Sequence, residues 1–253
     1  MPTTIVNRYR THTLAAAAML MLAGCGSGLN RYQGMEPGAL FDLANAEFED
    51  GDHGTAIRVL DRLLVGHGDW ERIPEARLLL GNVYFDRGDY LTSRSEYTRF
   101  LDRYAGHPAS VQASLGICQS LAALAPTPQR DQGYTQEAMS SCRNVVSDYT
   151  GRPESAEAAR ISNELRVLLA EKDYMNGDFY FRRRMWDPAI KYFEFVANLY
   201  PETSFAPQAL LGLYLSQQEI GYDDLAEEAR ERLLNQYPDS DAASAVRTDE
   251  SGG

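Results

Sequence analysis

Two distant stretches of this chain, beginning at Leu78 and Tyr174, align with each other position by position and without a gap. Small residues fall opposite small residues and aromatic rings opposite rings: Gly81 with Gly177, Tyr84 with Tyr180, Tyr90 with Trp186, Ser93 with Ala189 and Tyr97 with Phe193. Further copies contain Gly116 and Gly212, each 35 residues after the preceding glycine of the series. A period in this range indicates one supersecondary unit that is repeated and stacked on its neighbours.

Within each copy, apolar residues recur at steps of three and four, as on one face of a helix. Turn-forming segments such as 49–54 and 86–89 separate the two helices of a copy. The pattern resembles the tetratricopeptide repeat, in which small residues let paired helices approach closely. A weaker copy at the front has Ala44 and Ala56 in the small positions and Leu60 in the aromatic one. We therefore expect an all-α fold, a right-handed superhelix (α-solenoid) of five tetratricopeptide-like helix pairs over residues 37–246.

The third copy departs from the period, because only 61 residues separate Gly116 from Gly177. Segment 125–133 contains two prolines and predicts a long loop inside this repeat. Helix-forming residues return over 136–149. Apolar residues at helical steps, Met175 and Phe179 among them, then predict one long helix from Glu154 to about Met185.

Two cysteines, Cys118 and Cys142, lie in apolar helical patterns. In an oxidising compartment the two thiols could form a disulfide. Cysteine is also a small hydrophobe that packs unpaired in protein cores. The residues leave both interpretations open.

The amino-terminal segment has the layout of a secretory signal, with Arg8 and Arg10 before a short apolar run and small residues after it. The run ends in Leu22-Ala23-Gly24-Cys25, which resembles the lipobox of bacterial lipoproteins. We expect residues 1–24 to be a signal peptide, Cys25 to be acylated, and residues 25–36 to form a tether. Several acyl chains hold a protein on a membrane stably. Residues 247–253 are expected to be a disordered tail.

Charge limits the partners of the expected mature chain. Without residues 1–24 it carries 22 basic and 36 acidic residues, a net charge of −14. Such a surface repels nucleic acid and anionic lipid headgroups. Gly26 follows the cysteine, where aspartate would signal retention in the inner membrane. The resemblance therefore implies a lipid anchor in the outer membrane, on its periplasmic face.

No motif in the sequence points to catalysis. The three histidines beyond the expected signal, His53, His67 and His107, fall in predicted turns and have no second ligand at metal spacing. There is no nucleophile elbow, phosphate-binding loop or CxxC pair. We expect a non-enzymatic protein without cofactor or metal.

The first helices of the repeats predict a peptide groove. The positions that line the concave face in repeats of this kind include Phe41, Asn45, Phe48, Leu78, Asn82 and Phe85. An asparagine amide both donates to and accepts from a peptide backbone, and phenylalanine offers apolar contact. The alternative is that the phenylalanines cover the core and the asparagines are ordinary surface residues.

The basic run Arg182–Arg184 is exceptional in this acidic chain. It falls at the end of the predicted long helix, where cations are favourable to the helix dipole. The alternative is a docking patch for an acidic partner, because arginine matches carboxylate geometry.

The lipobox, the tether and the five repeats together resemble the BamD family of outer-membrane protein assembly factors. Segments 130–155 and 171–190 carry the features that go beyond generic repeats. The resemblance implies that the carboxyl-terminal repeats bind the barrel-forming assembly subunit through its periplasmic domains. It also implies that the amino-terminal repeats recognise unfolded outer-membrane proteins by their final strand.

Transferred to this chain, the resemblance places partner docking at Arg182, Arg183 and the helix that contains Lys191 and Tyr192. Many members have an arginine at the position of Tyr192, so Lys191 or the run through Arg184 would replace it here. Two other scaffolds of similar build remain as alternatives. One is a Tol–Pal-associated coordinator of cell-wall synthesis, and the other is a pilotin-like lipoprotein that escorts a secretin.

Overall fold

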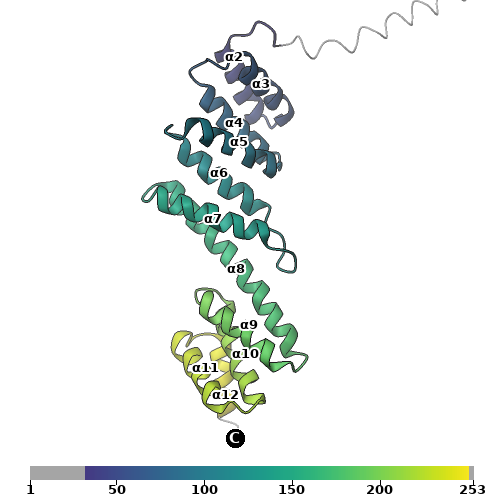
Figure 1. Cartoon of the computed structure of the whole chain (residues 1–253), viewed down its shortest axis with the longest axis vertical. Helices are drawn as coiled ribbons and strands as arrows, with labels where there is room; N and C mark the ends of the chain where they lie inside the picture. The colour runs from purple at the N-terminus through teal and green to yellow at the C-terminus, as the bar shows by residue number, and fades with distance from the viewer. Residues whose placement is uncertain (1–31, 251–253) are drawn as a thin grey trace, which may run out of the picture. The chain divides into compact units, whose positions relative to one another are not determined.

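A computed structural model describes residues 32–250, with side chains up to residue 247. The predicted signal peptide, Cys25 and most of the tether lie outside the described residues. The described part contains eleven helices and no strand (Figure 1): α2 (Pro37–Glu49), α3 (His53–Gly66), α4 (Ile73–Asp86), α5 (Tyr90–Tyr104), α6 (Ser110–Ala123), α7 (Gly133–Asp148), α8 (Pro153–Phe181), α9 (Trp186–Leu199), α10 (Phe205–Glu219), α11 (Asp223–Gln236) and α12 (Asp241–Glu250). The predicted all-α fold of tetratricopeptide-like helix pairs is confirmed, and helices pack against each other within the pairs α2/α3, α6/α7, α8/α9 and α10/α11. None of the described helices is long and apolar enough to cross a membrane.

The chain divides into two compact units, residues 1–83 and 84–253. In the described part of the first unit, α2 packs against α3. The small positions predicted for this weak copy, Ala44 and Ala56, are fully buried, and so is Leu60. Asp52 caps α3, because its carboxylate accepts from the backbone N–H of Thr55 at 2.9 Å.

In the second unit, glycines mark the places where helices meet. A methyl group on Gly116 would lie 2.4 Å from the Tyr97 ring, so only glycine lets α5 and α6 pack this closely. The Phe193 ring is packed in the same way against two glycines, Gly177 on α8 and Gly212 on α10. A methyl group added at either glycine would lie 2.7 or 2.6 Å from that ring, respectively. Burial raises the pKa of Tyr97 to about 12.

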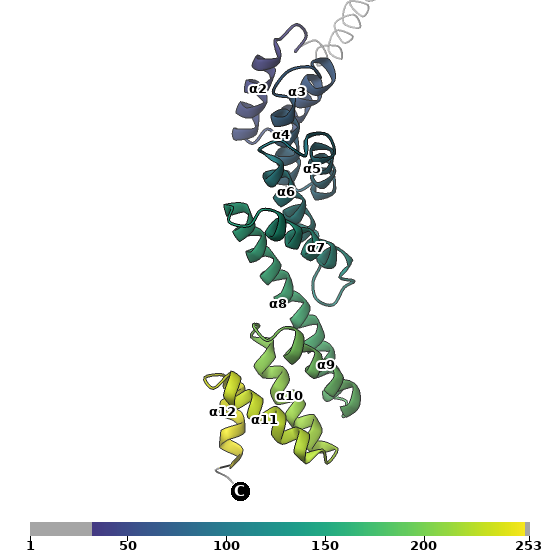
Figure 2. The same cartoon turned by 60° about the vertical axis from the view of Figure 1, so that its left-hand side comes forward.

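The third repeat has the expected long loop and long helix. α6 ends at Ala123, α7 begins at Gly133, and α8 runs for 29 residues. It packs against α6 and α7 on one side and against α9 and α10 on the other (Figure 2). Residues of its first half, such as Ile161, pack with Cys118 and Cys142, and aromatic rings of its second half pack around Phe193. The two cysteines form a disulfide with Cα atoms 4.9 Å apart, which joins α6 to α7.

Two details differ from the sequence expectations. The long helix ends at Phe181 rather than near Met185, because a left-handed residue follows it. Residues 247–250 of the predicted tail are helical instead, since α12 continues to Glu250. That helix is held by buried Ala243 and Val246 and by a bond from the Arg247 guanidinium to the Pro238 carbonyl at 3.0 Å. Residues 251–253 lie outside the described residues.

Candidate functional site

The turn between α8 and α9 contains the basic run and has an unusual backbone. The N–H of Met185 donates to the carbonyl of Tyr180, and the N–H of Arg184 donates to that of Phe181. This pair of bonds is a Schellman cap, in which one residue must be left-handed. Arg184 takes that position with φ 56°, and it is the non-glycine residue with positive φ among residues 32–250.

The corresponding turns of other repeats use glycine. Gly88 and Gly221 cap α4 and α10 through the same two bonds, and Gly51 follows α2, with φ between 76° and 87°. An L-residue other than glycine is disfavoured in this region by about 1–2 kcal/mol. The repeat at α8 therefore retains an arginine at a position where glycine would be more stable. Such an outlier points to a role for the side chain.

The arginines of the run differ in their surroundings. Arg182 forms two bonds to the Asp178 carboxylate, at 3.1 and 2.8 Å, although its side chain is 75% exposed. The Arg183 guanidinium lies 3.5 Å from the centre of the Phe179 ring and donates to the Phe179 carbonyl. Arg184 is exposed, and no acidic partner for it occurs in the described part of the chain. At least two of these cations are therefore not neutralised locally.

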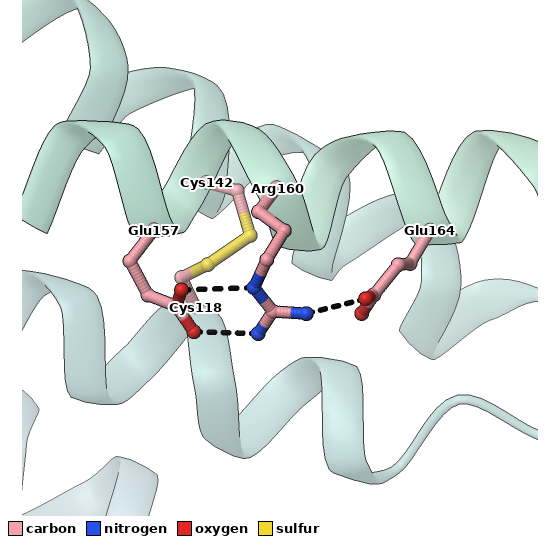
Figure 3. Close-up of polar contacts among 5 residues, drawn as sticks. All are labelled: Cys118, Cys142, Glu157, Arg160 and Glu164. Carbon is pink, nitrogen blue, oxygen red and sulfur yellow. Dashed lines mark hydrogen bonds and ion pairs between the residues drawn. A yellow bond between two sulfur atoms is a disulfide. The ribbon is translucent and has the colours of Figure 1, made fainter.

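Arg160, elsewhere on α8, differs from Arg183 and Arg184 because its charge is neutralised by neighbouring carboxylates. Its guanidinium bonds to both Glu157 oxygens, at 2.9 and 2.6 Å, and to Glu164 on the other side (Figure 3). The bond from Arg160 lowers the pKa of Glu157. The disulfide Cys118–Cys142 lies in the same view. Two carboxylates of its own helix already neutralise the Arg160 guanidinium and occupy several of its N–H donors. Arg160 therefore offers a partner protein little free charge.

Helix α9 contributes the other two predicted docking residues. Tyr192 is half-buried, and its ring stacks on Tyr180 with centroids 5.7 Å apart and an interplanar angle of 13°. This contact fixes α9 against the end of α8. Lys191, its neighbour in sequence, is exposed. We call the residues for which docking was predicted, Arg182, Arg183, Arg184, Lys191 and Tyr192, the basic docking surface.

Exposed apolar side chains accompany the basic docking surface. Phe179 and Met185 are 48% and 47% exposed. Phe179 and Met175 are among the apolar residues whose helical steps predicted the long helix, and both side chains are exposed. Arginine together with exposed aromatic and methionine side chains is a composition typical of protein–protein interfaces.

The predicted groove residues fall in both units. Phe41 is only 7% exposed, packs on Trp70 and lies beneath the Arg72 guanidinium, so it belongs to the core of the first unit. The Asn45 amide donates to the carbonyl of Phe41 at 2.9 Å, which leaves its oxygen available. Phe48 is half-buried beside His53.

The remaining groove residues lie on α4. Leu78 is half-buried and Asn82 is exposed. Phe85 belongs to the second unit, where it packs edge-on against Tyr90. The groove stays a prediction that rests on the repeat pattern.

No group of three histidine, cysteine, aspartate or glutamate side chains that could hold a metal ion occurs in the described residues. Sequence reasoning missed a different feature, a pocket between the loop after α6 and the carboxyl-terminal part of α8. The two prolines that mark the loop were the available signal.

Known proteins resemble the chain over most of its length. A family model described as YfiO, outer membrane lipoprotein, matches residues 33–233. The outer membrane protein assembly factor BamD of Xylella fastidiosa 9a5c is 24% identical over 79% of this chain and 60% of its own length. The BamD of Vibrio cholerae is 23% identical over 85% of this chain and 94% of its own length. The chain thus spans about 60% of the first of these relatives.

Among solved structures, the complex of the TPR2AB domain of yeast Sti1 with pHSP90 aligns with a TM-score of 0.44. It is 13% identical, and the alignment covers 85% of this chain and 86% of that chain.

Proposed function

The chain belongs to the YfiO family of outer membrane lipoproteins, and on that premise we propose that it is a non-catalytic, lipid-anchored scaffold for the assembly of outer-membrane β-barrels. Two relatives at 23–24% identity are named as outer membrane protein assembly factors, which supports this role. In the proposal the anchor is Cys25, and the repeats extend from the outer membrane into the periplasm. With a net charge of −12 for the full chain, lipid rather than basic residues would hold the protein there.

The observation that carries the proposal is the basic docking surface. Arg184 has the left-handed backbone conformation that glycine adopts in the corresponding turns of other repeats. The exposed side chains of Phe179 and Met185 lie beside the arginines of this surface. We assign this surface to the periplasmic part of the barrel-forming subunit, at an acidic patch with apolar contacts. Arginine guanidinium groups suit such carboxylates, and the apolar contacts add affinity.

We assign substrate binding to the amino-terminal unit. The free oxygen of Asn45, the half-buried ring of Phe48 and the exposed Asn82 could bind an extended strand of an unfolded outer-membrane protein. Shallow contacts of this kind give weak and reversible binding, as delivery of a substrate requires.

Charge reversal tests the docking surface. We would replace Arg183 and Arg184 by glutamate in the full-length protein and capture it from its native membranes in mild detergent. Glutamate at position 184 is about as strained as arginine, so the turn keeps a similar conformational cost. The matched control is Arg143→Glu, because Arg143 is an exposed arginine on α7 outside the surface.

The proposal predicts loss of the barrel-forming subunit from the double variant and normal recovery with the control. Circular dichroism would show that the helices of both variants remain intact. If the double variant retains the barrel subunit at the level of the control, the run only ends a helix and the docking assignment is wrong.

A further inference from the structure

The loop between α6 and α7 is held in one conformation by a buried glutamine. Gln132 is 4% exposed, and its amide nitrogen donates to the carbonyls of Thr127 and Arg130 at 3.0 and 3.1 Å. Its amide oxygen accepts from the buried Thr135 hydroxyl at 2.6 Å. A buried amide with both ends satisfied fixes the chain around it. The loop is therefore pre-organised rather than a flexible insertion.

This loop forms one wall of a pocket against α8. The Gln129 amide reaches the Met175 sulfur at 3.5 Å, and the Lys172 ammonium donates to the Arg130 carbonyl at 3.1 Å. The open pocket between the loop and α8 has a volume of about 320 Å³, within the range of small ligand pockets. We call it the loop–helix pocket; its walls include Pro128, Gln129, Lys172, Met175, Phe179 and Tyr180.

The floor of the loop–helix pocket is apolar and open to solvent. Met175 and Phe179 are one helical turn apart on the same face of α8, and they are 38% and 48% exposed. Exposed apolar side chains inside a concavity are typical of sites where another molecule binds. The flexible thioether of methionine adapts to different apolar side chains.

Cations lie at both ends of this floor. Lys172, one of two lysines in the chain, keeps two ammonium hydrogens beyond its bond to Arg130. At the other end, the Arg183 guanidinium covers the Phe179 ring. Seven residues separate Lys172 from Phe179, about 10 Å along a helix axis, which an extended peptide spans with about three residues.

We propose that the loop–helix pocket binds one aromatic side chain from an extended, acidic segment of a partner protein. The ring packs on Met175 and Phe179, and carboxylates on either side of it meet Lys172 and Arg183. The half-buried Asn176, which also lines the pocket, offers an amide to the peptide backbone. Charge complementarity selects this occupant, because local cations in an otherwise acidic protein favour an acidic ligand. The proposed site shares Arg183 with the basic docking surface and includes the neighbouring Phe179. Peptide binding to it can be measured whether or not the proposed scaffold function holds.

Methyl resonances of methionine test the site in the full-length protein in detergent micelles. Short capped peptides would carry a central phenylalanine with aspartates two positions to either side. Matched peptides replace the phenylalanine by serine, or the aspartates by lysine. The signal of Met175, assigned from the variant Met175→Leu, should shift saturably with a Kd of about 1 mM or tighter. The methyl of Met139 on α7, outside the pocket, should not shift.

Variants then locate the contact. Phe179→Ser should weaken binding at least tenfold, and Lys172→Glu should weaken it several-fold. The control is Val167→Ser, because Val167 is on the same helix, is 41% exposed and lies outside the pocket. Phe179 and Val167 are exposed, whereas Lys172 is half-buried and also bonds to Arg130. Circular dichroism of each variant checks that its helices form.

The absence of a saturable shift at Met175 would overturn the proposal. Equal affinity for the serine peptide or the lysine peptide would also overturn it, and so would unchanged binding in Phe179→Ser.

Discussion

Removal of the disulfide between Cys118 and Cys142 should cost the second unit several kcal/mol of stability. The bond closes a loop with a sequence separation of 24 residues, and both side chains are fully buried. Chain-entropy arguments give about 3.5 kcal/mol for a loop of this length, through restriction of the unfolded chain. The short turns that hold other helix pairs are absent here, because nine residues separate α6 from α7. The disulfide holds α6 and α7 together in place of a short turn.

Urea denaturation of the oxidised and reduced protein measures the effect. Trp186 begins α9 in the second unit, so its fluorescence reports this unit when Trp70 is replaced by phenylalanine. With m-values of about 1–3 kcal/mol per molar urea, the midpoint should fall by roughly 1–3 M on reduction. The variant with both cysteines replaced by alanine serves as the control, because reductant should not change its midpoint. A loss below about 0.5 kcal/mol would refute the idea that the bond restrains the unfolded chain.

Three further predictions concern packing, backbone strain and pH. Gly212→Ala should destabilise the second unit by about 1–3 kcal/mol in urea denaturation, because its methyl group would lie 2.6 Å from the Phe193 ring; an unchanged midpoint would contradict this packing. Arg184→Gly should stabilise the same unit by about 1 kcal/mol while it weakens capture of the barrel subunit, and a destabilised variant would show that the turn does not need a left-handed residue. Hydrogen bonds from Thr55 lower the pKa of Asp52 below its ordinary value of 3.8, so its stabilising effect is complete above that value and disappears as pH falls through the folded-state pKa. Acid titration followed by the fluorescence of the first unit should therefore show a smaller loss of stability in Asp52→Asn than in the wild type.

The repeat architecture could be predicted because its packing is local. Gly116, Gly177 and Gly212 were recognised as contact points of paired helices, and each meets an aromatic ring at a distance that excludes a methyl group. In a repeat protein each unit contacts its neighbours in the chain, so a periodic pattern carries most of the structural information. The long loop and the long helix of the third repeat followed from a break in the same period.

The sequence pattern did not give distances between residues in space. It also did not show which apolar helix faces are covered by other elements. The pairing of Cys118 with Cys142 depends on a separation in space that spacing in sequence does not give. Met175 and Phe179 follow helical periodicity, yet periodicity does not tell whether another element covers a given apolar face. The end of α8 was misplaced because Arg184 takes the left-handed position, and arginine gives no signal for a turn.

The loop–helix pocket was beyond prediction for a similar reason. Its loop depends on one glutamine, Gln132, whose bonds connect residues that the sequence does not mark as partners. Phe41 is the opposite of Met175 and Phe179, because it was expected at a surface and is buried. The repeat pattern placed it on an open face, and the structure buries it against Trp70 and Arg72.

The central claim is that this chain is a scaffold for the assembly of outer-membrane β-barrels. The most direct test is capture of the full-length protein from its native membranes in mild detergent, followed by mass spectrometry of the proteins that copurify. The account predicts a stoichiometric β-barrel protein with repeated periplasmic domains. Recovery of a secretin or of Tol–Pal components in its place would contradict the proposed function, although the helical repeat fold would stand.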